Sequence, residues 1–314
     1  MSHLFGPVPS RRLGRSLGVD LVPRKTCPFD CIYCEVGPTT QQTLERREYH
    51  TETIIQELAE YLRGPEAELD FITLAGSGEP TLNLGLGKII QAIKKMSSTP
   101  VAVLTNGALL YLPEVRRELA GADVILPSLD AAIEKTWRAI NRPLPEMSLA
   151  QMIEGLEALR REYQGQIWLE IMILKGLNDT EEELSALKQV IKRLAPDKVQ
   201  LNTAVRPVVD EAAQPLGPEE MQAIADFLGQ GAEVIASSPR PVSAETAASD
   251  ARFLEMLARR PMTAPDLAQV LGLPLDLVQQ RLKRLCKSGV ISHSLYQDQG
   301  FYRSQPVTVP DSRS

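Results

Sequence analysis

Cysteine, histidine and long apolar runs are scarce in this chain. Its 314 residues include 4 Cys and 3 His, which is too few for the disulfide framework of a secreted protein. No apolar run approaches the roughly 20 residues of a membrane-spanning helix. The N-terminus also lacks the apolar core of a secretory signal. We therefore expect a cytoplasmic protein that does not enter a membrane.

The composition is that of an ordinary globular protein. Hydrophobic residues make up 43% of the chain, and the net charge is −6 at pH 7. An acidic chain is not expected to coat nucleic acid or anionic membrane along its whole length. The length allows one large domain, or a large domain followed by a small one.

Three of the four cysteines, Cys27, Cys31 and Cys34, fall within eight residues, in the segment CPFDCIYC. A disulfide would leave one thiol over, and the cytoplasm keeps thiols reduced. Structural zinc takes four ligands, usually as two pairs, and the fourth cysteine is Cys286, far along the chain. A 4Fe–4S cluster is normally held by four thiolates, so three on one loop would leave one iron open for a substrate or cofactor.

The pattern C-x3-C-x-aromatic-C resembles the signature of the radical S-adenosylmethionine (radical SAM) enzymes, with Tyr33 as the aromatic. The resemblance implies that the three cysteines bind a 4Fe–4S cluster and that the open iron chelates S-adenosyl-L-methionine (SAM). It implies that Tyr33 packs near the adenine. It also implies reductive cleavage of SAM to a 5′-deoxyadenosyl radical, with the electron coming from a donor of the flavodoxin or ferredoxin type.

Short apolar runs alternate with amphipathic stretches over most of the chain. Strands are predicted at 16–21, 70–76, 101–107, 123–130, 167–176 and 198–204, and helices at 51–64, 85–96, 112–121, 148–163 and 179–195. This alternation predicts an α/β fold with a parallel sheet and right-handed crossovers. Six units predict a partial (β/α)6 TIM-like barrel, in which chemistry takes place at the carboxyl ends of the strands. A helix and a short strand at 214–236 are expected to close the barrel.

The segment GSGEPT at 76–81 follows the second predicted strand. Gly76 and Gly78 let the backbone approach a ligand, and Glu79 offers a carboxylate to an ammonium group. The segment resembles the Gly-Gly-Glu segment of radical SAM enzymes, which binds the amino group of SAM. Gly-Ser-Gly-Glu departs modestly from that pattern and keeps the acid.

Polar residues also end the later strands. The resemblance implies ribose contacts for Ser128 and Asp130, after the fourth strand. The remaining candidates for the cofactor site are Asn106, Lys175 and Asn202, at the ends of the third, fifth and sixth strands. Each of these segments is also typical of an ordinary turn.

The N-terminal segment FGPVPSRRLGRSLG carries Arg11, Arg12 and Arg15. One interpretation is a surface arm that covers the open edge of the barrel. The other is a basic lip that binds an anionic group of the substrate, joined by Arg206. Together with the cysteine loop and QLNTAVRP, the segment resembles radical SAM proteins allied to the wyosine-synthesis enzymes of tRNA.

A second domain is predicted after the barrel, which we place at 1–237. A linker at 238–250 precedes helices at 251–260, 263–272 and 274–289 and a hairpin at 289–303, with a disordered tail at 304–314. This order resembles a winged helix. Cys286 is expected to be a small buried hydrophobe of the last helix.

The predicted winged helix is basic, with eight Lys and Arg against four Asp and Glu in 251–303. Its candidates for contact with nucleic acid are Arg281, Lys283, Arg284 and Lys287, although winged helices also bind proteins. Three functions stay open. The first is a radical SAM enzyme that modifies a nucleic acid, with tRNA favoured. The second is a radical SAM enzyme that modifies or activates a protein, and the third is a DNA-binding redox sensor that uses the cluster without SAM chemistry.

Overall fold

The computed structural model describes residues 2–64, 68–229, 231–235 and 249–305, and the side chains of Pro9 and Arg252 are not described. The chain divides into two compact units. The first comprises Met1–Ala204 and Val208–Arg240, and the second comprises Val205–Pro207 and Pro241–Ser314. Most of the predicted linker at 238–250 and of the predicted tail at 304–314 lies outside the described residues.

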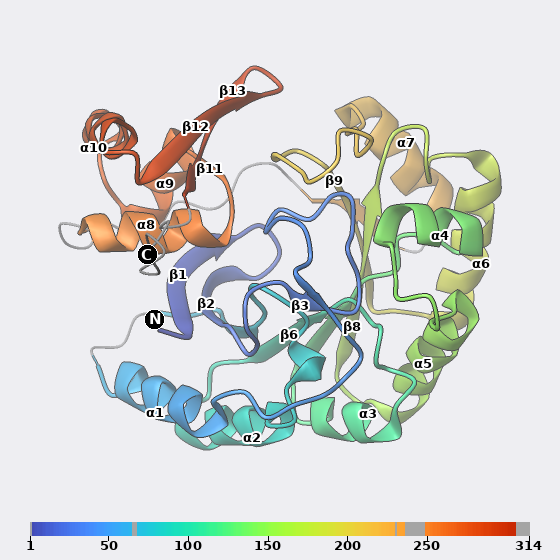
Figure 1. Cartoon of the computed structure of the whole chain (residues 1–314). Coiled ribbons are helices and arrows are strands. Elements are labelled where there is room, and N and C mark those ends of the chain that lie inside the picture. Colours follow the sequence, from blue (N-terminus) through green and yellow to red (C-terminus); the bar gives the residue numbers. More distant parts are fainter. Residues whose placement is uncertain (1, 65–67, 230, 236–248, 306–314) are drawn as a thin grey trace, which may run out of the picture. The chain divides into compact units, whose positions relative to one another are not determined.

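An eight-stranded sheet in the order β1-β2-β5-β6-β7-β8-β9-β10 forms the first unit (Figure 1). Every neighbouring pair from β2 to β10 is parallel, as the alternation of strands and helices predicts. These strands are β2 (Gly14–Val19), β5 (Phe71–Leu74), β6 (Val101–Thr105), β7 (Val124–Pro127), β8 (Gln166–Ile173), β9 (Lys198–Thr203) and β10 (Ala232–Val234).

The two edge strands of the sheet, at its N-terminal and C-terminal sides, were not fully predicted. β1 (Leu4–Ser10) pairs antiparallel with β2, so the N-terminal arm does cover the sheet edge, as a regular strand. Pairing of this kind satisfies the backbone groups that an open edge would leave unmatched. β10 pairs with β9 and is the last strand in the order. The prediction that this segment closes the barrel is therefore wrong, because β10 lengthens the sheet instead.

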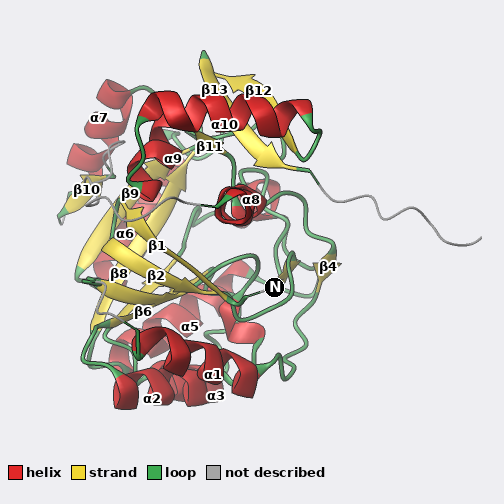
Figure 2. Ribbon diagram, turned by 90° about the vertical axis from the view of Figure 1, so that its left-hand side faces the viewer, coloured by secondary structure: helices red, strands yellow, loops and turns green. Residues whose placement is uncertain are grey.

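Helices lie outside the curved sheet (Figures 1 and 2). They are α1 (Thr51–Leu62), α2 (Leu86–Met96), α3 (Pro113–Leu119), α4 (Glu134–Asn141), α5 (Leu149–Glu162), α6 (Glu181–Leu194) and α7 (Pro218–Leu228). Short elements are the 3-10 helix at Pro80–Leu82 and the strands β3 (Thr26–Cys27) and β4 (Gln41–Gln42). α4 was not predicted, because its eight residues give too short an amphipathic pattern to stand out.

The interior of the barrel is plugged at the amino ends of its strands. Leu13, in the turn between β1 and β2, is 3% exposed and packs with Ala102, Val124, Leu126 and Trp168. Ala102 and Val124 lie at the beginnings of β6 and β7. Since parallel strands begin at one end of the sheet, Leu13 closes the end opposite to the loop that carries the cysteines.

The second unit is a winged helix. It contains α8 (Asp250–Arg259), α9 (Ala264–Leu271) and α10 (Leu275–Lys287), with β11 (Met262–Thr263), β12 (Ile291–Tyr296) and β13 (Gln299–Ser304) in the sheet order β11-β13-β12. The helices match the predicted ones to within two residues. None of the helices in the described ranges is long and apolar enough to cross a bilayer.

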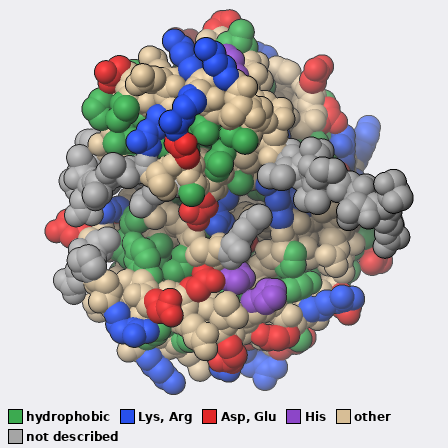
Figure 3. Space-filling view, turned by 60° about the vertical axis from the view of Figure 1, so that its left-hand side comes forward, with side chains coloured by type: hydrophobic (Ala, Val, Ile, Leu, Met, Phe, Trp, Pro, Cys, Tyr) green, Lys and Arg blue, Asp and Glu red, His purple; other side chains and the backbone are tan. Residues whose placement is uncertain are grey.

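Two histidines that are far apart in the sequence lie together. The ring centroids of His3 and His50 are 5.5 Å apart, and His3 Nδ1 lies 3.0 Å from Glu57 Oε1. Figure 3 shows two neighbouring His side chains on the surface of the molecule. The contact ties the start of β1 to α1.

Candidate functional site

The cysteine loop follows β2, at the carboxyl end of the parallel strands, and neighbouring segments hold it on two sides. Toward β5, Lys25 N donates to Ser77 O at 2.7 Å, and the Glu79 N–H donates to Thr26 O at 3.0 Å. Toward α4, Ile32 N donates to Ile140 O at 3.0 Å. The loop therefore has a fixed place in the fold that does not depend on the thiols alone.

Each clustered cysteine sulfur accepts one hydrogen bond from a different side chain. Lys25 Nζ lies 3.1 Å from Cys34 Sγ, and Asn106 Nδ2 lies 3.3 Å from Cys27 Sγ. Asn141 Nδ2 lies 3.4 Å from Cys31 Sγ. Donors of this kind suit sulfurs that carry negative charge as metal ligands.

Burial opposes ionisation of the Cys27 and Cys31 thiols while nothing is bound to them. It raises the pKa of Cys27 to about 12, with the charge of Glu79 as the next cause. Burial, followed by the charge of Cys27, raises the pKa of Cys31 well above its usual range. A neutral thiol must lose its proton to become a metal ligand, so a cationic cluster is the kind of group that these sulfurs suit.

The donor set fits the predicted cluster by its chemistry: three sulfurs on one loop, each with an N–H donor of the kind that surrounds iron–sulfur ligands. In the part of the chain that the structure describes, no three His, Cys, Asp or Glu side chains are grouped so as to hold a metal ion. The ligand role of Cys27, Cys31 and Cys34 accordingly stays a prediction.

Asp130 connects the cysteine loop to the sheet. Its Oδ2 accepts from the Tyr33 hydroxyl at 2.5 Å and from Asn141 Nδ2 at 2.6 Å, and its Oδ1 accepts from Met172 N at 2.9 Å. Burial raises the pKa of this carboxyl. Both oxygens are thus used within the protein. The predicted ribose contact of Asp130 gains no support from this geometry, and the side chain instead holds Tyr33 and Asn141.

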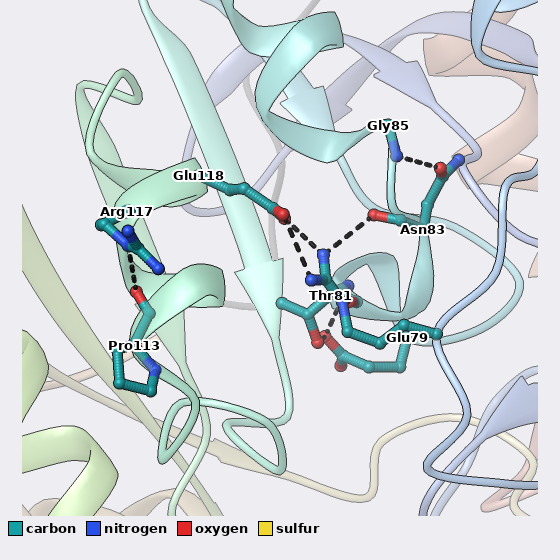
Figure 4. Close-up of polar contacts among 8 residues, drawn as sticks. Glu79, Thr81, Asn83, Gly85, Pro113, Arg117 and Glu118 are labelled. Carbon is teal, nitrogen blue, oxygen red and sulfur yellow. Dashed lines mark hydrogen bonds and ion pairs between the residues drawn. The ribbon is translucent and has the colours of Figure 1, made fainter.

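Glu79 is likewise used within the protein. Its Oε1 accepts from Thr81 N, the Thr81 hydroxyl and the Thr105 hydroxyl at 3.1, 2.6 and 2.6 Å, and its Oε2 accepts from Asn106 N at 2.8 Å. Figure 4 shows the contact with Thr81 at the start of the 3-10 helix. Burial raises the pKa of Glu79. We predicted an ammonium acceptor, but this carboxylate is already engaged by four donors and holds Asn106 in place.

The two glycines of this segment are required by close packing of the protein against itself. A Cβ on Gly78 would lie 2.3 Å from Thr26 O, and one on Gly76 would lie 2.5 Å from the Asp20 carboxylate. Gly76 also has φ +146°, which side-chain-bearing residues rarely adopt. The glycines therefore let the β5 loop lie against the cysteine loop.

The remaining candidates lie in two settings. Ser128 forms a bridge with Glu170 of β8, and buried Asn202 donates to Glu170 Oε1 at 3.5 Å. Lys175 is exposed and forms an ion pair with Glu220 of α7 at 2.9 Å. The structure therefore connects Tyr33, Asn106 and Asp130 to the cysteine sulfurs through hydrogen bonds, but gives Lys175 a surface contact.

The predicted basic lip gains no support from Arg12 and Arg15. Arg12 lies in the turn at the amino ends of the strands, beside Leu13, and forms an ion pair with Glu170. Arg15 belongs to the first half of β2. Both are therefore remote along β2 from the cysteine loop, which follows its carboxyl end. Arg206 is grouped with the second unit, and its predicted role is untested.

Two residues that contact the sulfurs were not predicted. Lys25 lies two positions before Cys27, and its place next to the motif was the only signal in the sequence. Asn141 is the last residue of α4, and no local pattern distinguishes it from any other polar residue at a helix end.

Comparison with known proteins identifies the family of the chain. The model of the radical SAM superfamily matches residues 21–187, which is over half of the sequence and includes the cysteine loop and the strands β5 to β8. The chain belongs to the radical SAM superfamily. Membership makes it an enzyme and implies a 4Fe–4S cluster, SAM and an external electron donor. A model described as a winged helix-turn-helix DNA-binding domain matches residues 255–292.

Relatives span different shares of the chain. A UPF0026 protein of Methanocaldococcus jannaschii is 38% identical over 217 residues, which cover 68% of this chain and 67% of that protein. A protein of Brachyspira hyodysenteriae described as GTPase Obg is 37% identical over 299 residues. That match covers 93% of this chain but 44% of the longer relative.

Two more distant matches concern methyltransferases. A protein of Flavobacterium psychrophilum described as a dual-specificity RNA methyltransferase is 25% identical over 211 residues, covering 63% of this chain and 58% of that one. The crystal structure of a radical SAM methyltransferase from Sphaerobacter thermophilus has a TM-score of 0.54 at 17% identity, over 70% of this chain and 65% of that chain. The structural match supports the fold.

Proposed function

We propose that this radical SAM enzyme cleaves SAM reductively at a single 4Fe–4S cluster bound by Cys27, Cys31 and Cys34, and that it modifies a macromolecule, favoured to be tRNA. The observation that carries the proposal is the cysteine loop at the carboxyl end of the sheet, with one side-chain N–H donor on each sulfur. We further propose a cytoplasmic location and an electron donor of the flavodoxin or ferredoxin type.

The roles of the chain's own residues follow from their contacts. When bound, the cluster and SAM supply the one-electron chemistry that produces a hydrogen-abstracting radical. Asp130 accepts from the hydroxyl of Tyr33 and so fixes the position of this side chain, which lies between Cys31 and Cys34 in the sequence. Glu79 holds the backbone of Asn106, whose amide contacts Cys27. Together these contacts keep the sulfurs in place before anything binds to them.

An RNA substrate is favoured by the second unit and by one relative. The winged helix carries exposed Lys283 and Lys287 on α10, and the RNA methyltransferase is similar to this chain over 211 residues. Arg284, also a candidate for this contact, forms an ion pair with Asp250. The GTPase name of the Brachyspira relative is not carried into the proposal, because this sequence has no G-x-x-x-x-G-K-[ST] loop.

The first test is anaerobic reconstitution with iron and sulfide, followed by SAM and dithionite. We expect 5′-deoxyadenosine to form with the natural sequence and not with Cys27→Ala. A reconstituted cluster that gives no 5′-deoxyadenosine would reject the SAM chemistry. It would also leave the DNA-binding redox sensor as the better explanation.

The second test addresses the substrate class. If α10 contacts RNA phosphates, Lys283→Gln combined with Lys287→Gln should lower the slope of log affinity against log salt by about 2. Lys192→Gln, on the exposed face of α6, is the matched control and should leave the slope unchanged. Capture of a protein substrate together with no salt-dependent RNA binding would favour the protein-modifying alternative.

A further inference from the structure

We propose that Lys25, Asn106 and Asn141 are positioning residues that tune the reduction potential of the cluster, each through a hydrogen bond to a different cysteine sulfur. The inference rests on the proposed function, since it concerns the cluster that Cys27, Cys31 and Cys34 would hold. Nothing in the superfamily membership assigns a role to these three side chains, and the argument depends on their contacts alone.

The three donors come from three separate parts of the first unit. Lys25 precedes β3, Asn106 follows β6, and Asn141 ends α4. Their nitrogen-to-sulfur distances, 3.1, 3.3 and 3.4 Å, are all within hydrogen-bond reach of a sulfur acceptor. One side-chain donor per sulfur, supplied from three places in the sequence, is an arrangement that the cysteine motif by itself does not require. Cys27 Sγ also accepts from the backbone N–H of Phe29 in its own loop, at 3.5 Å.

The orientation of both amides is fixed by a second contact. Asn106 Oδ1 accepts from Ala108 N at 2.9 Å, so its nitrogen must be the atom that faces Cys27. Asn141 Nδ2 also donates to Asp130 Oδ2 at 2.6 Å, and a carboxylate oxygen can only accept. Asn141 is 3% exposed. Both amides therefore present N–H groups to sulfur.

Position 25 is an unusual environment for a lysine side chain. Lys25 is 6% exposed, has φ +61°, and its backbone is held by Ser77 O and by the N–H groups of Thr40 and Gln41. A buried ammonium is costly unless it is paired, and the structure places its Nζ against Cys34 Sγ. A thiolate at Cys34 gives that charge an anionic partner.

These contacts act on electron transfer because the reduced cluster carries one more negative charge than the oxidised cluster. Hydrogen bonds to the sulfurs and nearby positive charge stabilise the more negative state and raise the potential. Lys25 supplies both a hydrogen bond and a charge, whereas each asparagine supplies a hydrogen bond only. We therefore expect the largest effect from Lys25.

The test is a redox titration of reconstituted full-length protein without SAM, followed by the electron paramagnetic resonance signal of the reduced cluster. At a fixed solution potential, Lys25→Met should lower the ratio of reduced to oxidised cluster about tenfold, which is about 59 mV for a one-electron couple. Asn106→Leu and Asn141→Leu should each lower it about threefold. Lys25→Arg, which keeps the charge and the donors, should stay within about twofold of the natural sequence.

The matched control is Asn83→Leu. Asn83 is also fully buried, but its amide donates to the backbone oxygens of Leu21 and Tyr49 (2.7 and 3.0 Å). Figure 4 shows Asn83 beside Gly85, and Asn83 Oδ1 accepts a hydrogen bond from Gly85 N. This variant should lose stability and keep the ratio of the natural sequence, which separates a general structural effect from an effect on the cluster.

The outcomes distinguish this inference from the proposed function. If the natural sequence assembles no cluster, the proposed function fails. If its cluster titrates normally and the Lys25→Met and asparagine variants keep its ratio, the inference is overturned and the proposed function stands. If Lys25→Met holds no cluster, Lys25→Gln decides: it keeps an N–H donor without the charge, so a fall of about threefold is expected and an unchanged ratio rejects the role of Lys25.

Discussion

The two ends of the barrel use similar residue types for opposite purposes. At the amino ends of the strands, Leu13 and Trp168 pack into an apolar plug, and Arg12 of the same turn forms an ion pair with Glu170, in the middle of β8. At the carboxyl ends, charged and amide side chains contact the cysteine sulfurs. Polar groups thus pair with one another near the plug, whereas at the carboxyl end a subset of them, Lys25, Asn106 and Asn141, contacts atoms able to bind a cofactor.

The largest effect should come from the carboxyl end. Cys31→Ser removes one of three thiolates, and a hydroxyl is a poor ligand for iron in a cluster. We expect the iron content of the reconstituted protein to fall from about four per chain to near none, with the visible absorbance of the cluster lost as well.

The control for that change is Cys286→Ser in α10 of the second unit. Cys286 is partly exposed, so the expectation of a buried residue is wrong. It is far along the chain from the clustered cysteines, so iron content should not change. Full iron content in Cys31→Ser would contradict the ligand role of this cysteine and with it the asymmetry between the two ends.

Much of this contrast was predictable from the sequence. Strand and helix periodicity predicts the parallel order from β2 to β9, and the spacing of Cys27, Cys31 and Cys34 predicts where a cluster would bind. The end of the sheet to which Arg12 belongs was not predictable. The segment reads as a polar arm, and only the pairing of β1 with β2 turns its tip toward the amino end.

Side-chain partners were the other part that the sequence left open. Glu79 and Asp130 follow strands, as cofactor-binding acids do, yet both have their oxygens engaged by the protein. Local sequence cannot distinguish these roles because the partners, Thr105 and Asn141 among them, come from segments far along the chain. Donors to sulfur such as Asn141 were missed for the same reason.

The next effect tests the plug at the amino end. Leu13→Ala removes buried methyl groups from a closely packed apolar cluster, so the free energy of unfolding should fall by about 3 kcal/mol. Urea unfolding measures the change. The cluster should assemble normally, because the plug lies away from the cysteine loop.

Leu84→Ala is the control for the plug. Leu84 is 51% exposed, and its truncation should change the free energy of unfolding by no more than about 0.5 kcal/mol. If Leu13→Ala were as mild as Leu84→Ala, the amino end would not be a packed plug, and the comparison between the two ends would lose its structural basis.

The smallest effect concerns the ion pair between Arg12 and Glu170, whose side chains are 20% and 15% exposed. Arg12→Met leaves the Glu170 carboxylate without its cation, and the free energy of unfolding should fall by about 1–2 kcal/mol. Arg12→Met combined with Glu170→Met should cost less than the sum of the two single changes, because neither charge is then left alone.

The charge of Glu170 already contributes, after burial and nearer groups, to the raised pKa of Asp130 and of Tyr33. The cluster's redox ratio in Arg12→Met is therefore a second measurement. An unchanged ratio means that the ion pair does not act on the sulfurs, and a lowered ratio means that it does.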